Sequence, residues 1–188
     1  ALPISNSDLP IDGVKTKDMV SILTGFERLG IRVELGDDSL RVPPNQELVI
    51  QNDLGDQVPK IEDGPWPALP ADLTSIAVAV ATQAWGTVLV FEKMFENRLF
   101  FVDKLVGMGA RIVLCDPHRV VVNGPAKLYG DRMESPDIRA GMAMLIASLC
   151  AEGPSVIGNI RQIDRGYERI DQKIRDLGGQ IERIEDGP

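Results

Sequence analysis

Three segments of the chain repeat one pattern of apolar and polar positions. In each, apolar residues recur at spacings of three and four, a glycine follows, and apolar and polar residues then alternate; the segments are 19–33, 101–113 and 169–181. These features are typical of an amphipathic helix, a left-handed helix end and a strand. Polar turns at 36–38 and 116–118 lead the first two copies into return strands at 40–42 and 119–122, which predicts two β-hairpins.

A second and more apolar helix is predicted twice ahead of this pattern, over Ile76–Trp85 and Ala140–Ala151. Each helix starts beside an acidic residue, Asp72 or Asp137, which the positive end of the helix dipole favours. Each then leads past a glycine into a short strand, at 87–90 and 155–157. The predicted unit is therefore helix, strand, helix, strand, strand.

These repeats predict an α/β chain of three units within one domain: residues 1–60 (a partial first unit and a loop), 61–130 and 131–188. The first copy lacks its first helix and begins at its strand, near Leu2–Ile4. Because a repeat unit cannot bury its apolar face alone, we expect the chain to begin inside a domain; the alternative is a divergent capping unit. The polar stretch 43–70 is predicted to be a surface loop.

Composition narrows the class of protein. Of the 188 residues, 44% are apolar and 26% charged, as in a globular protein, and the net charge of −8 argues against general nucleic-acid binding. The apolar runs are too short to span a bilayer and the first residues do not form a secretory signal, so we expect a cytoplasmic protein without a membrane partner. Two cysteines and one histidine favour neither a metal site nor a disulfide framework, and no motif indicates a cofactor. Cys115 and Cys150 are predicted to be buried.

Four short motifs carry a resemblance to a known family. They are Pro67–Leu73, Met94–Arg98, Asp137–Ala140 and Ile163–Ile170, with FENR and DRGYERI the most specific. With them the chain resembles the enolpyruvyl transferases, in particular the UDP-N-acetylglucosamine 1-carboxyvinyltransferase branch, closely over 61–185 and more weakly over 1–60. The resemblance implies an enzyme of two similar domains, each an inside-out α/β barrel of repeated units. The chain would be its C-terminal part, with an incomplete first unit, and the companion domain would be its partner.

The resemblance also implies a reaction. The 3-hydroxyl of UDP-N-acetylglucosamine attacks C2 of phosphoenolpyruvate and phosphate leaves, in a committed step of peptidoglycan synthesis. Carried onto this sequence, Asp72 holds the sugar hydroxyl and is the candidate base. Arg165, the second catalytic candidate, lies nearest phosphoenolpyruvate. The remaining substrate-binding residues would be Met94 and Phe95 at the nucleotide sugar, Arg98 and Arg139 at the anions, and Asp137 at the family's second carboxylate site. The general acid would belong to the companion domain.

Each assignment has a simpler alternative. Asp72 follows Pro70 at a helix start and could be a helix cap, Arg98 could form a surface ion pair, and Arg165 could lie on a solvated face. Changed neighbours after Asp72 and Arg139 leave room for another acceptor, such as shikimate 3-phosphate. A non-catalytic binding module derived from the family is a further alternative.

Overall fold

The structure is a computed structural model that describes Ile4 and residues 8–184. Its first part is a three-stranded antiparallel sheet in the order β1-β3-β2, covered by one helix. The hairpin β2–β3 is the predicted one, and Gly30 ends the helical segment with a left-handed φ of 79°. The bounds are β1 Leu9–Asp12, η2 Thr16–Met19, α1 Val20–Glu27, β2 Glu34–Leu35 and β3 Ser39–Val42.

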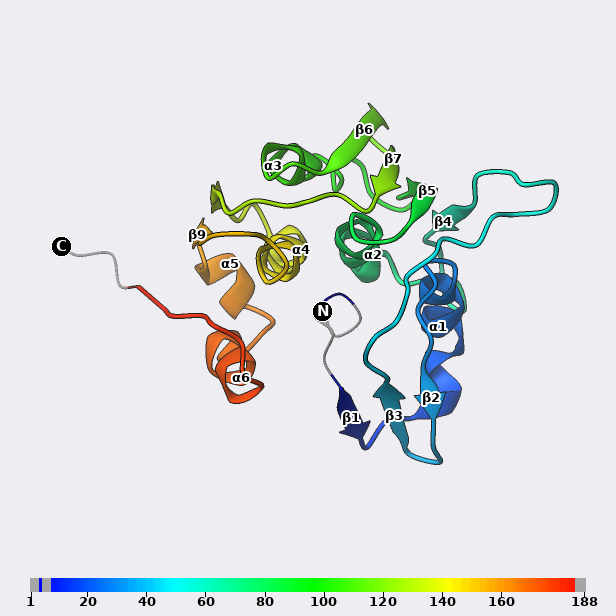
Figure 1. The fold of residues 1–188 in the computed structure, drawn as a ribbon, viewed down its shortest axis with the longest axis horizontal. Helices are drawn as coiled ribbons and strands as arrows, with labels where there is room; N and C mark the ends of the chain where they lie inside the picture. Colours follow the sequence, from blue (N-terminus) through cyan, green and yellow to red (C-terminus); the bar gives the residue numbers. More distant parts are fainter. Residues whose placement is uncertain (1–3, 5–7, 185–188) are drawn as a thin grey trace.

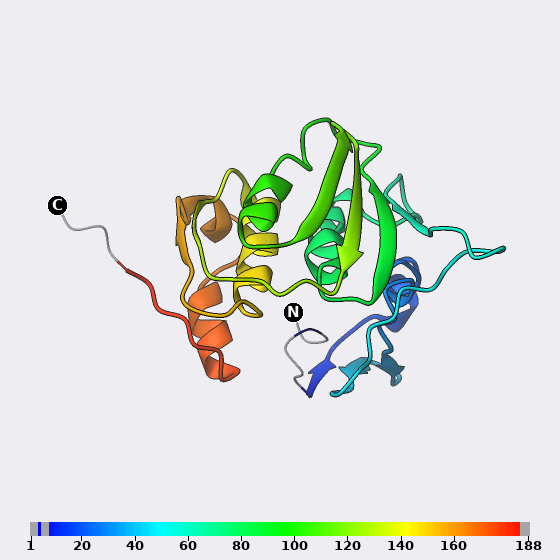
Figure 2. The ribbon, with the colours of Figure 1, turned by 45° about the horizontal axis from the view of Figure 1, so that its top comes forward.

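The middle part is a four-stranded mixed sheet with two helices on one side (Figures 1 and 2). Its order is β4-β5-β7-β6; β4 runs parallel to β5, and the other neighbours are antiparallel. Valines that face each other across β5 and β7, such as Val90 and Val120, are fully buried. The bounds are β4 Lys60–Glu62, η3 Ala71–Leu73, α2 Thr74–Ala81, β5 Gly86–Phe91, α3 Val102–Gly107, β6 Arg111–Asp116 and β7 Arg119–Gly124.

The last part repeats the parallel strand pair and its intervening helix. Strands β8 and β9 flank α4, and two short helices follow. Asp137 begins α4, as predicted, by accepting hydrogen bonds from the backbone of its first turn. The bounds are β8 Arg132–Glu134, α4 Ile138–Ser148, β9 Val156–Gly158, α5 Arg161–Asp164 and α6 Ile170–Asp176.

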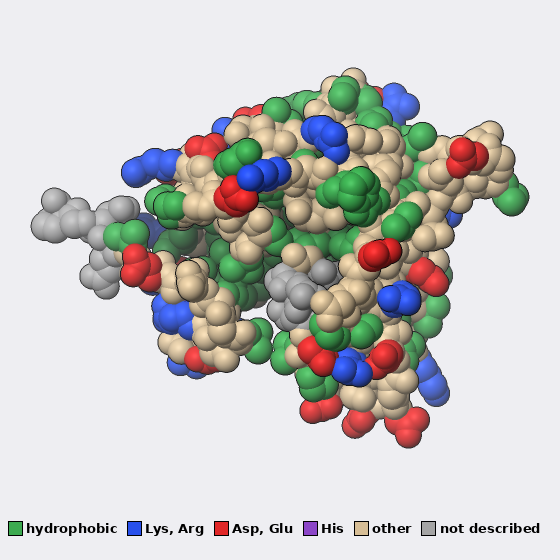
Figure 3. Space-filling view, in the orientation of Figure 1, with side chains coloured by type: hydrophobic (Ala, Val, Ile, Leu, Met, Phe, Trp, Pro, Cys, Tyr) green, Lys and Arg blue, Asp and Glu red, His purple; other side chains and the backbone are tan. Residues whose placement is uncertain are grey.

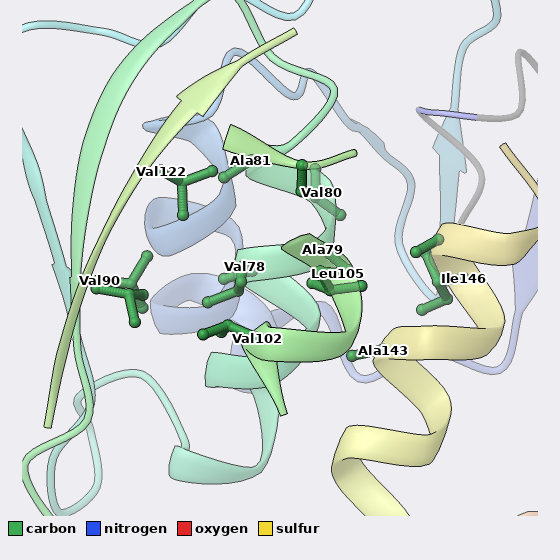
Figure 4. Packing of buried hydrophobic residues seen from close by; sticks show 14 of the residues in the cluster. Val78, Ala79, Val80, Ala81, Val90, Val102, Leu105, Val122, Ala143 and Ile146 are labelled. Carbon is green, nitrogen blue, oxygen red and sulfur yellow. The ribbon is translucent and has the colours of Figure 1, made fainter. Parts of the chain in front are cut away.

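Helices α2 and α4 lie side by side in the middle of the molecule, with the sheets outside them (Figure 1). Nearly every residue of α2 is buried, and small residues such as Ala77 and Ala143 allow the two helices to approach closely. Figure 4 shows α2 side chains facing Val90 and Val122 of the sheet. Helices within and sheets outside give the inside-out α/β arrangement that the family resemblance implies. Figure 3 shows acidic side chains gathered at the edge formed by the β2–β3 sheet.

The repeated unit has one strand more than predicted. Strands β4 and β8 precede the central helices α2 and α4, so the complete unit is strand, helix, strand, helix, strand, strand. The segment 43–70 is therefore not only a surface loop, since it supplies β4 and the buried side chains of Leu48, Ile50 and Ile61. Single apolar residues at alternate positions of a polar stretch are enough to form a core strand. The division of the chain at residues 60 and 130 stays a prediction.

The strand predicted near Leu2–Ile4 falls mostly on Leu2 and Pro3, which lie outside the described residues, and stays a prediction. The first strand of the described part is β1, at Leu9–Asp12. The strand predicted after α6 is wrong. No strand follows α6 within the described residues. A strand needs a hydrogen-bonding neighbour, and this segment is held instead through Arg183, which binds Asp164 and Asp171 at 2.9 and 3.1 Å.

The prediction for the cysteines is wrong for Cys115. It lies exposed on β6, the edge strand of its sheet, where the preceding Val113 and Leu114 are exposed as well. Cys150 is partly buried after α4, and burial raises the pKa of its thiol to about 11.

Candidate functional site

Asp72 and Arg139 join the starts of the two central helices. Arg139, in the first turn of α4, donates a hydrogen bond from Nε to Asp72 Oδ1 in η3, just before α2. The Asp72 side chain is 64% exposed and makes no helix-capping bond, so the simpler interpretation of this residue as a cap does not hold. Its carboxylate raises the pKa of Arg139. The pair brings the positive ends of two helix dipoles together, which favours an anion there.

Asp137 holds the first turn of α4 in place. Its Oδ1 accepts hydrogen bonds from the backbone N–H groups of Arg139 (2.7 Å) and Ala140 (3.0 Å). The carboxylate predicted to belong to a substrate site is therefore bound to the backbone in this structure. Through that backbone it orients Arg139.

Arg98 completes the cluster from the segment that follows β5. Its guanidinium carbon lies 3.5 Å from the centre of the Phe95 ring, and its Nη1 lies 3.6 Å from Asp72 Oδ1. The side chain is only 18% exposed, so it is not part of a simple surface ion pair. Asp72, Arg98 and Arg139, called here the arginine–aspartate cluster, thus come from three elements. Met94 and Phe95 are both partly open to solvent beside it.

Asp63 was missed by the sequence analysis, although it supports this segment. It is buried at the end of β4, and its carboxylate accepts hydrogen bonds from the backbone N–H groups of Lys93 and Met94, the latter at 3.3 Å. These bonds fix the turn that presents Met94 and Phe95. The sequence feature that could have identified Asp63 is the alternation of inward and outward positions along β4, which continues from Ile61 to Asp63.

Glu92 was missed for a similar reason. It extends the inward alternation of Val88 and Val90 in β5 and has an exposed fraction of 0%. Its Oε1 lies 3.9 Å from Arg98 Nη1. Burial and the neighbouring Asp63 carboxyl raise the pKa of Glu92 to about 7.

Arg165 is not joined to the cluster by a described contact. It lies exposed at the end of α5, where Nη1 is 3.4 Å from Gln162 Oε1. The next residue, Gly166, packs closely against the start of α4, since a Cβ at Gly166 would lie 2.1 Å from Ile138 Cδ1. This packing keeps the backbone of Arg165 near the start of α4. The structure thus brings Asp72, Arg98 and Arg139 together and leaves Arg165 at the side of α4.

Three further observations concern the described part of the chain outside the cluster. Within the described residues, no three His, Cys, Asp or Glu side chains are grouped so as to hold a metal ion. No helix in that part of the chain is both long and apolar enough to cross a membrane. A hollow of about 640 Å³ lies on another side, between α1 and residues 60–69, and is lined by Val20, Ser21 and Trp66 among others; it contains none of the cluster.

The sequence of the chain is similar to that of known carboxyvinyltransferases. Residues 4–174 match the sequence model of the EPSP synthase (3-phosphoshikimate 1-carboxyvinyltransferase) family. The UDP-N-acetylglucosamine 1-carboxyvinyltransferase of Bradyrhizobium diazoefficiens is 58% identical over 181 residues, 96% of this chain and 42% of the relative. The protein of the same name from Treponema denticola is 51% identical over 179 residues, 95% of this chain and 42% of the relative. The chain thus spans about two fifths of the curated relatives it matches.

Solved structures share the fold. The enolpyruvyl transferase NikO from Streptomyces tendae superposes with a TM-score of 0.77 at 22% identity, over 94% of this chain and 41% of that one. EPSP synthase from Acinetobacter baumannii superposes with a TM-score of 0.59 at 14% identity, over 82% of this chain and 35% of that one. At these identities the likeness concerns the fold alone.

Proposed function

Because the chain belongs to the EPSP synthase family of carboxyvinyltransferases, we propose that it forms one wall of an enolpyruvyl transferase active site. The complete enzyme would transfer the enolpyruvyl group of phosphoenolpyruvate to the 3-hydroxyl of UDP-N-acetylglucosamine and release phosphate. The names of relatives that are 58% and 51% identical support this acceptor over shikimate 3-phosphate. The chain would be the C-terminal part, and a companion domain would supply the opposite wall and the general acid. We place the enzyme in the cytoplasm, in peptidoglycan synthesis.

Asp72 is the proposed base. An ionised carboxylate that is accessible to solvent can accept the proton of the acceptor hydroxyl as its oxygen attacks C2 of phosphoenolpyruvate. Its charged neighbours are Arg139 and Arg98. To accept a hydrogen bond from the acceptor hydroxyl, the Asp72 carboxylate has to break its contact with at least one of these arginines. The proton required at C3 comes from the companion domain.

Arg98, Arg139 and Arg165 are the proposed anion-binding residues. Phosphoenolpyruvate carries a phosphate and a carboxylate, and the departing phosphate needs fixed positive charge. Arginine provides it with a planar fork that binds two oxygens at once. The starts of α2 and α4, which Asp72 and Arg139 join, add the positive ends of two helix dipoles to the same side. Asp137 would act by orienting Arg139, and Met94 and Phe95 would contact the nucleotide sugar.

The observation that carries this proposal is the bond between Asp72 and Arg139 at the meeting point of the two helix starts. Its test is a titration of the ¹⁵N-labelled chain with UDP-N-acetylglucosamine. Amide shifts are expected at 71–73 and 94–98, with weak affinity because one wall retains only part of the contact area. Shikimate 3-phosphate at equal concentration is the comparison. Shifts confined to residues 43–64, or stronger shifts with shikimate 3-phosphate, would contradict the proposal.

Activity is measurable in a hybrid enzyme, in which this chain replaces the matching part of the Bradyrhizobium diazoefficiens transferase. At 58% identity, most positions of the replaced part keep the same residue. This hybrid enzyme allows each proposed residue to be changed in a two-walled site.

A further inference from the structure

Glu92 is a buried carboxyl that the proposed reaction does not use. Its exposed fraction is 0%, and neither of its oxygens has a hydrogen-bond partner within the described residues. Burying a carboxyl without partners is unfavourable, and an apolar residue at the end of β5 would pack better against Val88 and Val90. A role other than stability is therefore needed to explain this residue.

The cation beside Glu92 is Arg98. Its Nη1 lies 3.9 Å from Glu92 Oε1 and 3.6 Å from Asp72 Oδ1, and it too is buried without a hydrogen-bond partner in the described part of the chain. The Phe95 ring, 3.5 Å from the guanidinium carbon, restricts movement on one side. A shift of about 1 Å would bring Nη1 within hydrogen-bond distance of Glu92. Arg98 therefore lies between one exposed and one buried carboxylate.

We infer that Glu92 is a positioning residue for Arg98: a buried counter-charge that keeps this guanidinium at the anion-binding side of the site when Asp72 turns to the acceptor hydroxyl. The inference rests on the proposed function, because that function is what takes Asp72 away from Arg98. Without Glu92, the arginine would then lose both charged partners at the moment when its position matters. Charge-assisted hydrogen bonds to a fixed carboxylate hold such a group better than neutral contacts do.

The protonation state of Glu92 decides whether it can hold Arg98. Burial and Asp63 raise the pKa of Glu92 to about 7, against the opposing effects of Thr74 and Arg98. Below that pH the carboxyl is neutral and releases the arginine; above it, the carboxylate is charged and holds it. The polar and charged groups that face Glu92 are Asp63 after β4, Thr74 on α2, Arg98, Arg139 on α4, and His118 of the β6–β7 turn, whose Nδ1 lies 2.7 Å from the Glu92 carbonyl oxygen.

The direct test follows the Nε–H signal of Arg98 by NMR in the 188-residue chain between pH 5.5 and 8.5. In the unmodified chain the signal is expected to shift with a midpoint near the pKa of Glu92, and Glu92→Gln should abolish that shift. Glu62→Gln is the matched control, since this carboxylate on neighbouring β4 pairs with Lys60 and Lys93 instead. His118→Gln removes the imidazole that contacts the Glu92 carbonyl oxygen and should leave the midpoint unchanged. The same midpoint in Glu92→Gln would overturn the inference.

The second readout is turnover in the hybrid enzyme. Glu92→Gln is expected to lower kcat/KM for phosphoenolpyruvate roughly 10- to 100-fold, the range that follows from misplacing one group by about 1 Å, and to remove the loss of activity below pH 7. Glu62→Gln should retain the parent rate and pH profile. Unchanged kinetics in Glu92→Gln would contradict the inference. An inactive parent hybrid would contradict the proposed function instead, and the Arg98 signal would still decide the role of Glu92.

Discussion

Arg165 and Arg169 lie close together in the segment from α5 to α6, yet only Arg165 is proposed to meet a substrate. In the hybrid enzyme, Arg165→Ala is expected to lower kcat roughly 10²- to 10³-fold, the usual cost of one preorganised charge-stabilising donor. Arg165→Lys should recover part of the lost kcat, because lysine keeps the positive charge but lacks the planar fork of the guanidinium. Steady-state phosphate release measures both.

The control for this change is Arg169→Asn. Arg169 has a left-handed φ of 48°, which asparagine tolerates better than most residues, so the backbone is preserved. This variant should keep nearly full activity. Equal and small effects at both positions, with unchanged circular dichroism, would assign Arg165 to the solvated face.

The raised pKa of Glu92 also predicts how the stability of the chain depends on pH. Between the ordinary carboxyl pKa of 4.5 and the folded value of about 7, the folded chain keeps a proton that the unfolded chain has lost. The contribution of Glu92 to stability therefore falls as pH rises through this window and is constant above it. The glutamine of Glu92→Gln does not titrate. The unfolding free energy of this variant minus that of the unmodified chain should therefore increase by up to about 3 kcal/mol from pH 4.5 to 8. Urea unfolding at several pH values measures this, and a constant difference would contradict the pKa shift.

At the scale of single residues, the sequence identified side chains that lie together in the structure but missed the buried residues that support them; the roles given to the site residues stay predictions. The motif residues Asp72, Arg98 and Arg139 do meet in the structure. Glu92 and Asp63 were missed because charged residues in short strands look like exposed positions until the inward face of the strand is known. That face is determined by neighbours distant in sequence, such as β7 beside β5.

Among the elements, the contact of α5 with α4 is sensitive to side-chain size. A Cβ at Gly141 of α4 would lie 2.6 Å from Ile163 Cγ1 and 2.3 Å from Ser135 Oγ. Gly141→Ala is therefore expected to destabilise the chain by roughly 1–3 kcal/mol through overpacking. It should also displace α5, and with it Arg165.

Gly25→Ala on α1 is the matched control for this change. The added Cβ would lie 3.0 Å from the end of the flexible Leu69 side chain, while alanine favours the helix by up to about 1 kcal/mol. Thermal unfolding of both variants tests the prediction. An equal loss of stability in the two variants would contradict the prediction that close packing between α4 and α5 sets the cost at Gly141.

Helices and hairpins were predictable because their signals are local. The three-and-four spacing and the glycines at helix ends identified α1, α3 and α6, and polar turns identified both hairpins. Strands β4 and β8 were missed because each has three residues with charged side chains at both ends, and only parallel pairing with β5 and β9 makes them strands. The strand expected after α6 has no neighbour to pair with in the described chain.

At the scale of the whole molecule, the chain is proposed to be one wall of a two-walled site. The isolated chain is then expected to release no phosphate above background from phosphoenolpyruvate and UDP-N-acetylglucosamine, because the acid and part of the anion site would lie on the other wall. A coupled phosphate assay on the purified 188-residue chain measures this. Sustained turnover by the chain alone would show that it carries a complete site.

The most direct test of the central claim is the acceptor dependence of the hybrid enzyme. With phosphoenolpyruvate present, phosphate release should require UDP-N-acetylglucosamine, should not occur with shikimate 3-phosphate, and should fall at least 10²-fold in Asp72→Asn, in line with the loss of a general base. A hybrid that folds but releases no phosphate with UDP-N-acetylglucosamine, or that prefers shikimate 3-phosphate, would contradict the account.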